Sequence, residues 1–214
     1  MVLIRRVSHR IRQTVINAQK HCNISVSGFY NHPDYGIIIL LKRRAGWCIL
    51  LLIFDFLTVS ILKNYESAII RVVAVSFFLP MILNAGGNAG WQVSVAISRA
   101  LKRGEISCAS FFSVIRKEII AALFLGLIVG AVAFVRGYLL NFDLLMALFV
   151  GISVVAIVFM SAMTGLFLPL ISKKIGFDSS VLAAPLIISI VNILGLLIYF
   201  NIAIRFLPAL KGVF

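Results

Sequence analysis

The segment from Ser67 to Ala100 is long and apolar, yet it contains an unusual run of polar and helix-breaking residues. Its centre, from Pro80 to Gln92, has the sequence PMILNAGGNAGWQ. The flanking residues are apolar enough to cross a bilayer, whose hydrocarbon core supplies no hydrogen bonds. Amide side chains, glycine and proline at that depth are tolerated where they face protein or a water-filled path. Any fold of this chain must therefore shield this stretch from lipid.

The spacing of the amide side chains places them on one face of a helix. Asn84, Asn88 and Gln92 follow one another at intervals of four residues, which gives a single polar stripe. Three glycines beside the stripe leave room for another backbone to come close: Gly86, Gly87 and Gly90. A packed helix pair with interhelical amide bonds is one interpretation. The lining of a polar pathway is the other, and the stripe favours it because packing requires only the glycines.

The composition of the chain indicates a membrane protein. Hydrophobic residues make up 62% of its 214 residues and charged residues 13%, and the mean hydropathy is +1.10. Soluble domains are closer to half apolar and a quarter charged. The net charge of +13 does not indicate nucleic-acid binding, because the basic residues lie mainly between apolar runs. There they set membrane topology and meet the anionic head groups of the lipid bilayer.

Five apolar segments are long enough to span a bilayer of about 30 Å. We therefore predict an all-α integral membrane protein with five transmembrane helices per subunit. A basic cytoplasmic or interfacial segment, residues 1–45, would precede a transport domain at residues 46–214. The proline and glycines of the second span are expected to break or bend it. The five predicted spans are Gly46–Leu62, Ser67–Ala100, Ile119–Val135, Leu144–Ser172 and Val181–Leu207.

The distribution of positive charge predicts the orientation. Of the 20 lysines and arginines, 15 lie before Gly46, between Arg99 and Lys117, or at Lys173 and Lys174. With five spans these three regions fall on the same side of the membrane. Because cytoplasmic loops are enriched in lysine and arginine, we predict a cytoplasmic N-terminus and an external C-terminus. The expected location is the bacterial inner membrane.

The first 45 residues contain one further pattern. Five apolar residues recur at helical spacing, so they would share one face of a helix, and arginines would occupy its other faces. The pattern is typical of a basic amphipathic helix on the inner membrane surface, and a helix packed on cytoplasmic loops remains an alternative. The apolar positions are Ile4, Val7, Ile11, Val15 and Ala18.

Several motifs together resemble the MgtE family of magnesium transporters. The strongest pair is GGNAG in the second predicted span and GLLIYF about a hundred residues later, in the fifth. The resemblance covers roughly Lys42 to Leu207. Motifs that agree in order and spacing are Pro80 to Gln92, Arg99-Ala100-Leu101, Gly104-Glu105-Ile106, Arg116-Lys117-Glu118, Leu168-Pro169-Leu170, Gly176-Phe177-Asp178, and Asn192 to Phe200.

This resemblance implies a homodimer of five-helix subunits. Its second and fifth helices line an ion path at the two-fold axis, and Mg²⁺ enters the cell down its electrochemical gradient. The sequence departs from the family pattern in two ways. The cytoplasmic helical domain and the paired CBS domains that sense Mg²⁺ have no counterpart in the 45 residues before the first span, so we do not expect that form of gating. The fifth-helix aspartate of the family pore aligns with Asn192.

The residue types in these spans suit hydrated Mg²⁺. This ion demands octahedral oxygen coordination and releases its water reluctantly, so a pore can hold it through contacts from amide and hydroxyl oxygens to the bound water. Asp55, in the middle of the first span, is either a protonated or hydrogen-bonded structural carboxyl facing a neighbouring helix, or a functional one that supplies negative potential near the path or carries a proton. The candidate metal-contacting residues are Asn192, Asn88, Ser189, Asn84, Gln92 and Asp55.

Other functions remain open at this stage. A membrane enzyme that modifies phospholipids needs clustered acids, and the seven acidic residues are dispersed. Walker, GxSxG and HExxH motifs do not occur in the sequence, so we do not expect an enzyme. A transporter of another divalent cation, a carrier coupled to Na⁺ or H⁺, and a non-conducting regulatory relative are the alternatives.

Overall fold

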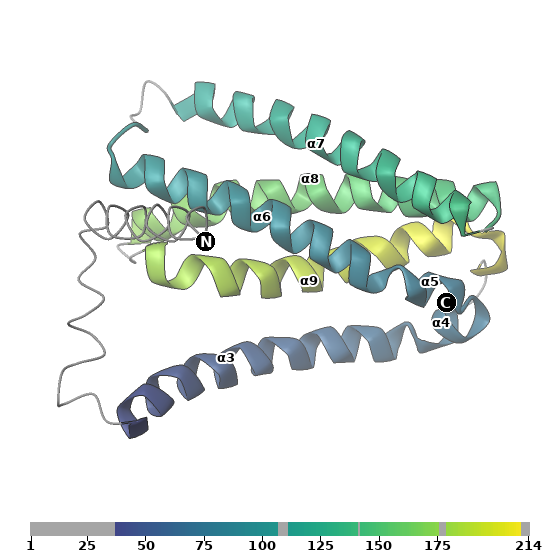
Figure 1. Ribbon diagram of the computed structural model, residues 1–214, viewed down its shortest axis with the longest axis horizontal. Coiled ribbons are helices and arrows are strands. Elements are labelled where there is room, and N and C mark those ends of the chain that lie inside the picture. The colour runs from purple at the N-terminus through teal and green to yellow at the C-terminus, as the bar shows by residue number, and fades with distance from the viewer. Residues whose placement is uncertain (1–36, 107–110, 141, 176–178, 211–214) are drawn as a thin grey trace, which may run out of the picture. The chain divides into compact units, whose positions relative to one another are not determined.

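A computed structural model describes residues 37–106, 111–140, 142–175 and 179–210 (Figure 1). All regular secondary structure in these ranges is helical, which confirms the all-α prediction for them. The predicted amphipathic helix at residues 4–18 lies outside the described residues. The helices are α3 (Ile37–Asn64), α4 (Glu66–Arg71), α5 (Ala74–Phe77), α6 (Leu79–Lys102), α7 (Phe111–Leu139), α8 (Leu144–Ile175), α9 (Ser179–Phe206) and the short 3₁₀ helix η1 (Pro208–Leu210).

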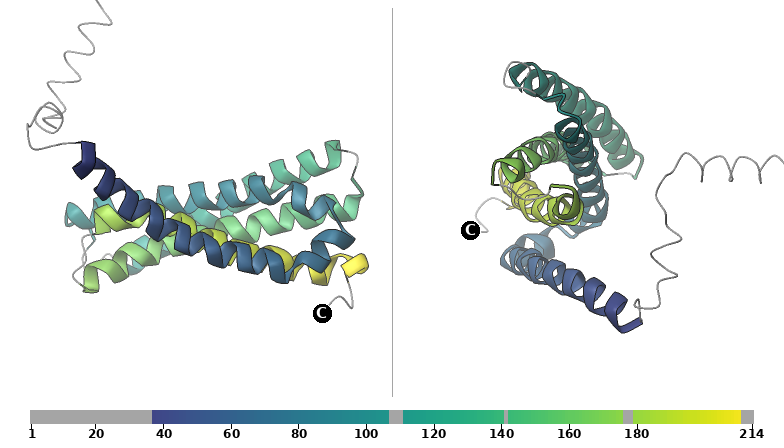
Figure 2. Two further views of the ribbon diagram at one scale, coloured as in Figure 1. Left: turned by 90° about the horizontal axis from the view of Figure 1, so that it is seen from below. Right: turned by 90° about the vertical axis from the view of Figure 1, so that its left-hand side faces the viewer.

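The chain divides into two compact units, residues 1–49 and 50–214. In the second unit α6, α8 and α9 contact one another, and α7 packs along α8 (Figures 1 and 2). The core between these helices is mostly aliphatic over one half and strongly aromatic near the start of α6. Its largest fully buried side chains include Tyr199, Phe149, Phe200, Ile82 and Ile157.

Three helical segments are long and apolar enough to cross a membrane: Phe111–Leu139, Leu144–Ile175 and Leu186–Phe206. They coincide with the third, fourth and fifth predicted spans. The first and second predicted spans correspond to α3 and to the series from α4 to α6. The amides and glycines within α6 lower the hydropathy of the second of these regions. The number of five transmembrane helices therefore stays a prediction.

The second predicted span is interrupted at a different place from the one expected. The helix breaks at Val72–Val73 and again at Phe78, whereas the glycines from Gly86 to Gly90 lie inside the continuous helix α6. The prediction that they break the helix was wrong. Pro80 lies in the first turn of α6, where its missing N–H costs nothing. The glycines stay helical because their small size lets neighbouring helices approach.

The closest approach lies between α6 and α8. A Cβ atom built on Gly90 would lie 2.9 Å from the carbonyl oxygen of Ser161, and one on Gly86 would lie 2.9 Å from Cγ2 of Ile157. A Cβ on Gly165 would overlap the carbonyl oxygen of Gly90. Small residues at such crossings allow close van der Waals packing, which drives helix association in lipid. This close contact limits how far α6 can rotate about its own axis relative to α8.

Basic residues gather where α6 ends, α7 begins and α8 ends, and Figure 1 shows these three termini at one end of the bundle. The ammonium group of Lys173 on α8 donates a hydrogen bond to the carbonyl of Leu101 on α6, with 3.5 Å between the atoms. Two of the three basic regions that were used to predict the orientation therefore lie at the same end of the bundle. The residues are Arg99, Lys102, Arg103, Arg116, Lys117, Lys173 and Lys174.

From Leu50 onward, α3 packs on the other helices mainly near its C-terminal end. Residues 50–60 include no buried side chain, whereas Ile61 and Leu62 pack against the core. The ring of Tyr65 then stacks on Phe200 of α9, with 4.6 Å between the ring centroids. The end of α3 is thereby fixed against α9.

Candidate functional site

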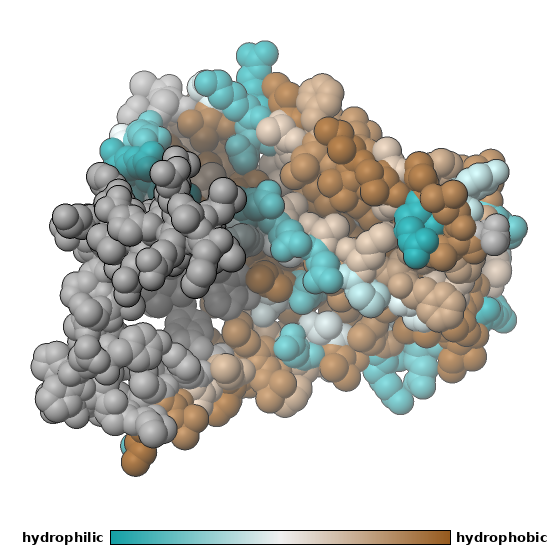
Figure 3. Space-filling view, viewed as in Figure 1, coloured by the Kyte–Doolittle hydropathy of each residue, from teal (hydrophilic) through white to brown (hydrophobic). Residues whose placement is uncertain are grey.

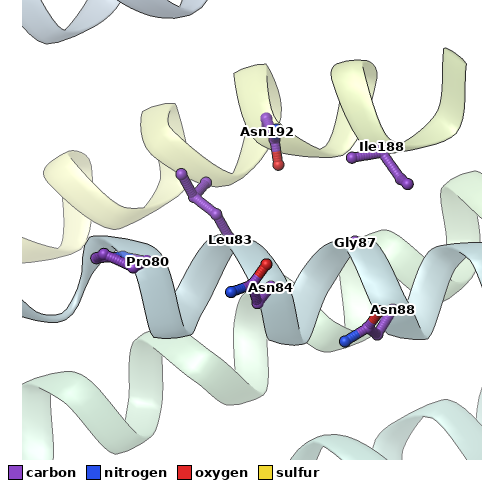
Figure 4. Close-up of a pocket in the computed structure, with 7 residues that line it drawn as sticks. All are labelled: Pro80, Leu83, Asn84, Gly87, Asn88, Ile188 and Asn192. Atoms are coloured by element: carbon purple, nitrogen blue, oxygen red, sulfur yellow. The ribbon is translucent and has the colours of Figure 1, made fainter. Parts of the chain in front are cut away.

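A groove between α6 and α9 brings together three of the predicted site residues. It has a volume of about 320 Å³ and is open on one side. Asn84 and Asn88 contribute from α6, and Asn192 contributes from α9 (Figure 4). In this view Asn192 points from α9 toward α6. The remaining lining residues are Pro80, Leu83, Gly87 and Ile188.

The two amides of α6 face outward from the subunit. Asn84 and Asn88 are exposed, and Asn192 is half-buried. In Figure 3 a band of hydrophilic side chains crosses an otherwise hydrophobic face where α6 lies. Amides on such a face are costly against lipid, so in a membrane this side of the groove requires water or another protein surface. The predicted polar stripe is therefore present as a surface feature of the subunit.

The other three predicted residues do not line the groove. Gln92 continues the stripe of α6 beyond the groove and is exposed, whereas Ser189 is buried. Asp55 is exposed on α3 and belongs to a different part of the unit. A role for these residues in contacting the ion stays a prediction.

The sequence predicted the amide residues of the groove but not its apolar lining residues. Leu83 and Ile188 were not predicted as site residues, yet they bound the groove beside the asparagines. For Ile188 a signal was available, since it lies one helical turn before Asn192 and so shares its face. Gly87 was interpreted as a packing glycine. It is buried and also lines the groove, where a Cβ would be in ordinary contact with Ile188 of α9 at 3.6 Å.

The groove can accommodate a hydrated ion. Six waters, the inner shell of Mg²⁺, occupy about 180 Å³ at about 30 Å³ each in the liquid, which is less than the volume of the groove. Its polar side chains are neutral amides, each of which offers one carbonyl acceptor and two N–H donors. Within the described ranges, no three His, Cys, Asp or Glu side chains gather closely enough to hold a metal ion. The donor set therefore suits contacts to bound water better than direct coordination.

Three helices apolar enough to cross a membrane, together with a polar groove between α6 and α9, define a helical membrane protein with a candidate solute path. The sequence comparison is more specific. A profile of the MgtE family, described as divalent cation transporters, matches residues 79–202. The chain belongs to the MgtE family. This match confirms the resemblance seen in the sequence, and it contains both walls of the groove. Members of this family are transporters and not enzymes.

Characterised relatives support the same assignment. The magnesium transporter MgtE of Bacillus subtilis is 31% identical over 177 residues, which cover 83% of this chain and 39% of the relative. MgtE of Thermus thermophilus is 31% identical over 200 residues, 91% of this chain and 44% of the relative. MgtE of Enterococcus faecalis is 28% identical over 167 residues. The chain thus spans less than half the length of the relatives it matches.

Proposed function

We propose that this protein conducts Mg²⁺ passively across the membrane, driven by the membrane potential. The path would run at the axis of a homodimer, with the groove between α6 and α9 forming one half of it. The observation that carries this proposal is the convergence of Asn84, Asn88 and Asn192 on one groove. Mg²⁺ is here the transported ion and not a resident cofactor.

The open side of the groove supports the dimeric arrangement. Exposed amides on α6 would otherwise face lipid, whereas a second copy placed against the same face would enclose a polar path between two grooves. The amide oxygens would then contact the water shell of the ion from both sides. A shell that stays intact avoids most of the cost of dehydrating Mg²⁺.

The membrane potential is sufficient to drive uptake. One elementary charge crossing 100 mV gains about 2.3 kcal/mol, so a divalent ion gains about 4.6 kcal/mol. This is enough for accumulation by more than a thousandfold, since each tenfold ratio corresponds to about 1.4 kcal/mol. A coupled ion is therefore not required, although a carrier coupled to Na⁺ or H⁺ is an outcome that the next experiment distinguishes.

Gly87→Leu should reduce Mg²⁺ flux at least tenfold, because the new side chain projects into the groove. Leucine has a higher helix propensity than glycine, and its first side-chain atom, Cβ, would meet only ordinary contacts. Flux would be measured with purified protein in liposomes holding a Mg²⁺-sensitive dye, at a set potential. Parallel assays with Co²⁺, Ca²⁺ and Na⁺ gradients identify the ion, and Mg²⁺ flux with and without a Na⁺ or pH gradient identifies any coupling.

Gly46→Leu is the matched control, because a Cβ on Gly46 has no atom within 4 Å. It should leave flux unchanged. Equal flux in both variants would show that ions do not pass through the groove. Wild-type protein that is folded but passes none of the four ions would instead favour the non-conducting alternative.

We also propose that the protein lies in the bacterial inner membrane with its N-terminus in the cytoplasm. Cysteines introduced at Lys102 and Lys63 should then react with a membrane-impermeant thiol reagent from opposite sides, Lys102 from the cytoplasm. The purified protein should have the mass of a dimer by light scattering after correction for detergent. Labelling of Lys102 from outside would reverse the orientation, and a monomeric mass would remove the proposed axis.

A further inference from the structure

The backbone just before the groove is irregular, and only Val75 and Phe78 of this segment are buried. Between α4 and α5, Val72 has φ −133° and ψ 80°, which ends the helix. Two hydrogen bonds in this region span only three residues, from Val75 N to Val72 O and from Ser76 N to Val73 O, at 3.0 and 2.9 Å. In lipid, backbone groups released by such a break need partners within the protein.

Tyr199 on α9 supplies one of these partners. Its hydroxyl donates a hydrogen bond to the carbonyl oxygen of Val75, with 2.7 Å between the oxygens, and both residues are fully buried. The ring of Tyr199 packs against Phe149 and Phe200, with centroid distances of 4.9 and 5.6 Å. These contacts hold the ring in place, so the hydroxyl is directed at the interrupted segment.

This hydrogen bond links α9, one wall of the groove, to α5, the short helix that precedes the other wall. Tyr199 lies two helical turns after Asn192 on the same helix, about 10 Å along its axis. Val75 lies in α5, which leads directly into α6 and its lining residues Pro80 and Asn84. The position of α6 along α9 at this end therefore depends on a bond that lies outside the groove.

We propose that Tyr199 is a positioning residue for ion selection. Its bond to Val75 fixes the start of α6 against α9 and thereby sets the spacing between the amides of α6 and Asn192. This inference rests on the proposed function of the groove. A groove of fixed width suits the compact hexahydrate of Mg²⁺, whereas one that is free to widen also accepts the larger and more variable shell of Ca²⁺.

Tyr199→Phe tests the proposal, because it removes the hydroxyl and keeps the aromatic packing. The ratio of Mg²⁺ to Ca²⁺ flux in liposomes should fall at least fivefold, while Mg²⁺ flux stays within about threefold of wild type. A purely structural hydrogen bond would lower thermal stability without changing this ratio. Tyr138→Phe is the control. It removes a tyrosine hydroxyl from an exposed position on α7 and should leave both fluxes unchanged.

A second measurement does not depend on transport. Spin labels at Phe77 on α5 and Leu194 on α9, both exposed, report the distance between α9 and the segment that leads into α6, after the native cysteines are replaced with serine. Tyr199→Phe should shift or broaden this distance distribution, and Tyr138→Phe should not. An unchanged distribution, or a shifted one with an unchanged flux ratio, overturns the positioning role. Wild-type protein without Mg²⁺ flux would refute both the proposed function and ion selection by Tyr199. The distance measurement would then still test whether the hydroxyl positions the segment that leads into α6.

Discussion

Asn192→Asp is expected to lower the Kd for Mg²⁺ at least tenfold and to sharpen selectivity over Na⁺. Asparagine has a carbonyl oxygen of the same reach as the carboxylate but lacks its charge. At an effective dielectric of about 20, a divalent ion about 5 Å from one unit charge gains roughly 7 kcal/mol before desolvation is subtracted. Even if most of this gain is cancelled, the 1.4 kcal/mol needed for a tenfold effect remains. Calorimetric titration and flux assays on the purified protein would measure both changes.

The wild-type protein should therefore pass hydrated Mg²⁺ with low affinity and weaker discrimination against monovalent ions. Asp55 offers a different source of negative potential, although it does not line the groove. If Asp55 supplies the field, Asp55→Asn should reduce flux or remove its pH dependence, and Asn192→Asp should add little. No gain in affinity or selectivity from Asn192→Asp, together with unchanged flux in Asp55→Asn, would show that Asn192 does not contact the ion path.

Gly165→Ala is expected to produce a larger loss of stability than the same substitution at the other glycines in the described part of the chain. The new Cβ would overlap the carbonyl oxygen of Gly90 and lie 3.2 Å from the backbone nitrogen of Ser94. Both contacts are with backbone, so no side chain can rotate away and the two helices must separate. Overpacking of this kind costs about 1–3 kcal/mol or more. The loss of stability would be measured by thermal unfolding in detergent, with the fraction of protein that stays monodisperse as the readout.

Gly195→Ala is the matched control for that variant. It adds the same methyl group to another helical glycine, but the nearest atom to the new Cβ is Cγ2 of Ile157 at 3.5 Å, an ordinary contact. Because alanine is favoured over glycine in helices by about 1 kcal/mol, this variant should be as stable as wild type or slightly more so. Equal melting temperatures for both variants would show that α6 and α8 do not cross as closely as the structure indicates.

Helix separation at Gly165 would also affect the groove. Gly90 lies on the face of α6 that packs against α8, and Asn88 lies on the face that lines the groove. A shift of α6 away from α8 would therefore move its amides relative to Asn192. The glycines that pack against α8 and the amides that line the groove are therefore different residues of α6. The geometry of the groove depends on the packing of those glycines.

The sequence determined the helical class, the apolar segments and the stripe of amides. These follow from local properties: the residues needed to cross a bilayer, the helical repeat of 3.6 residues, and the cost of amides in lipid. Asn84 and Asn88 could be assigned to one face because their spacing alone decides it. The motifs that revealed the family are also properties of the linear sequence.

Tertiary structure decided which residues meet. Asn192 lies far from Asn84 in the sequence, and only the packing of α9 on α6 brings both to one groove while leaving Gln92 and Ser189 outside it. The position of the helix break was also decided in this way. Glycines are weak helix formers, yet those of α6 remain helical because close contacts with α8 and α9 compensate. The backbone opens instead at Val72, and Tyr199 from a distant helix provides a hydrogen bond to the segment that follows.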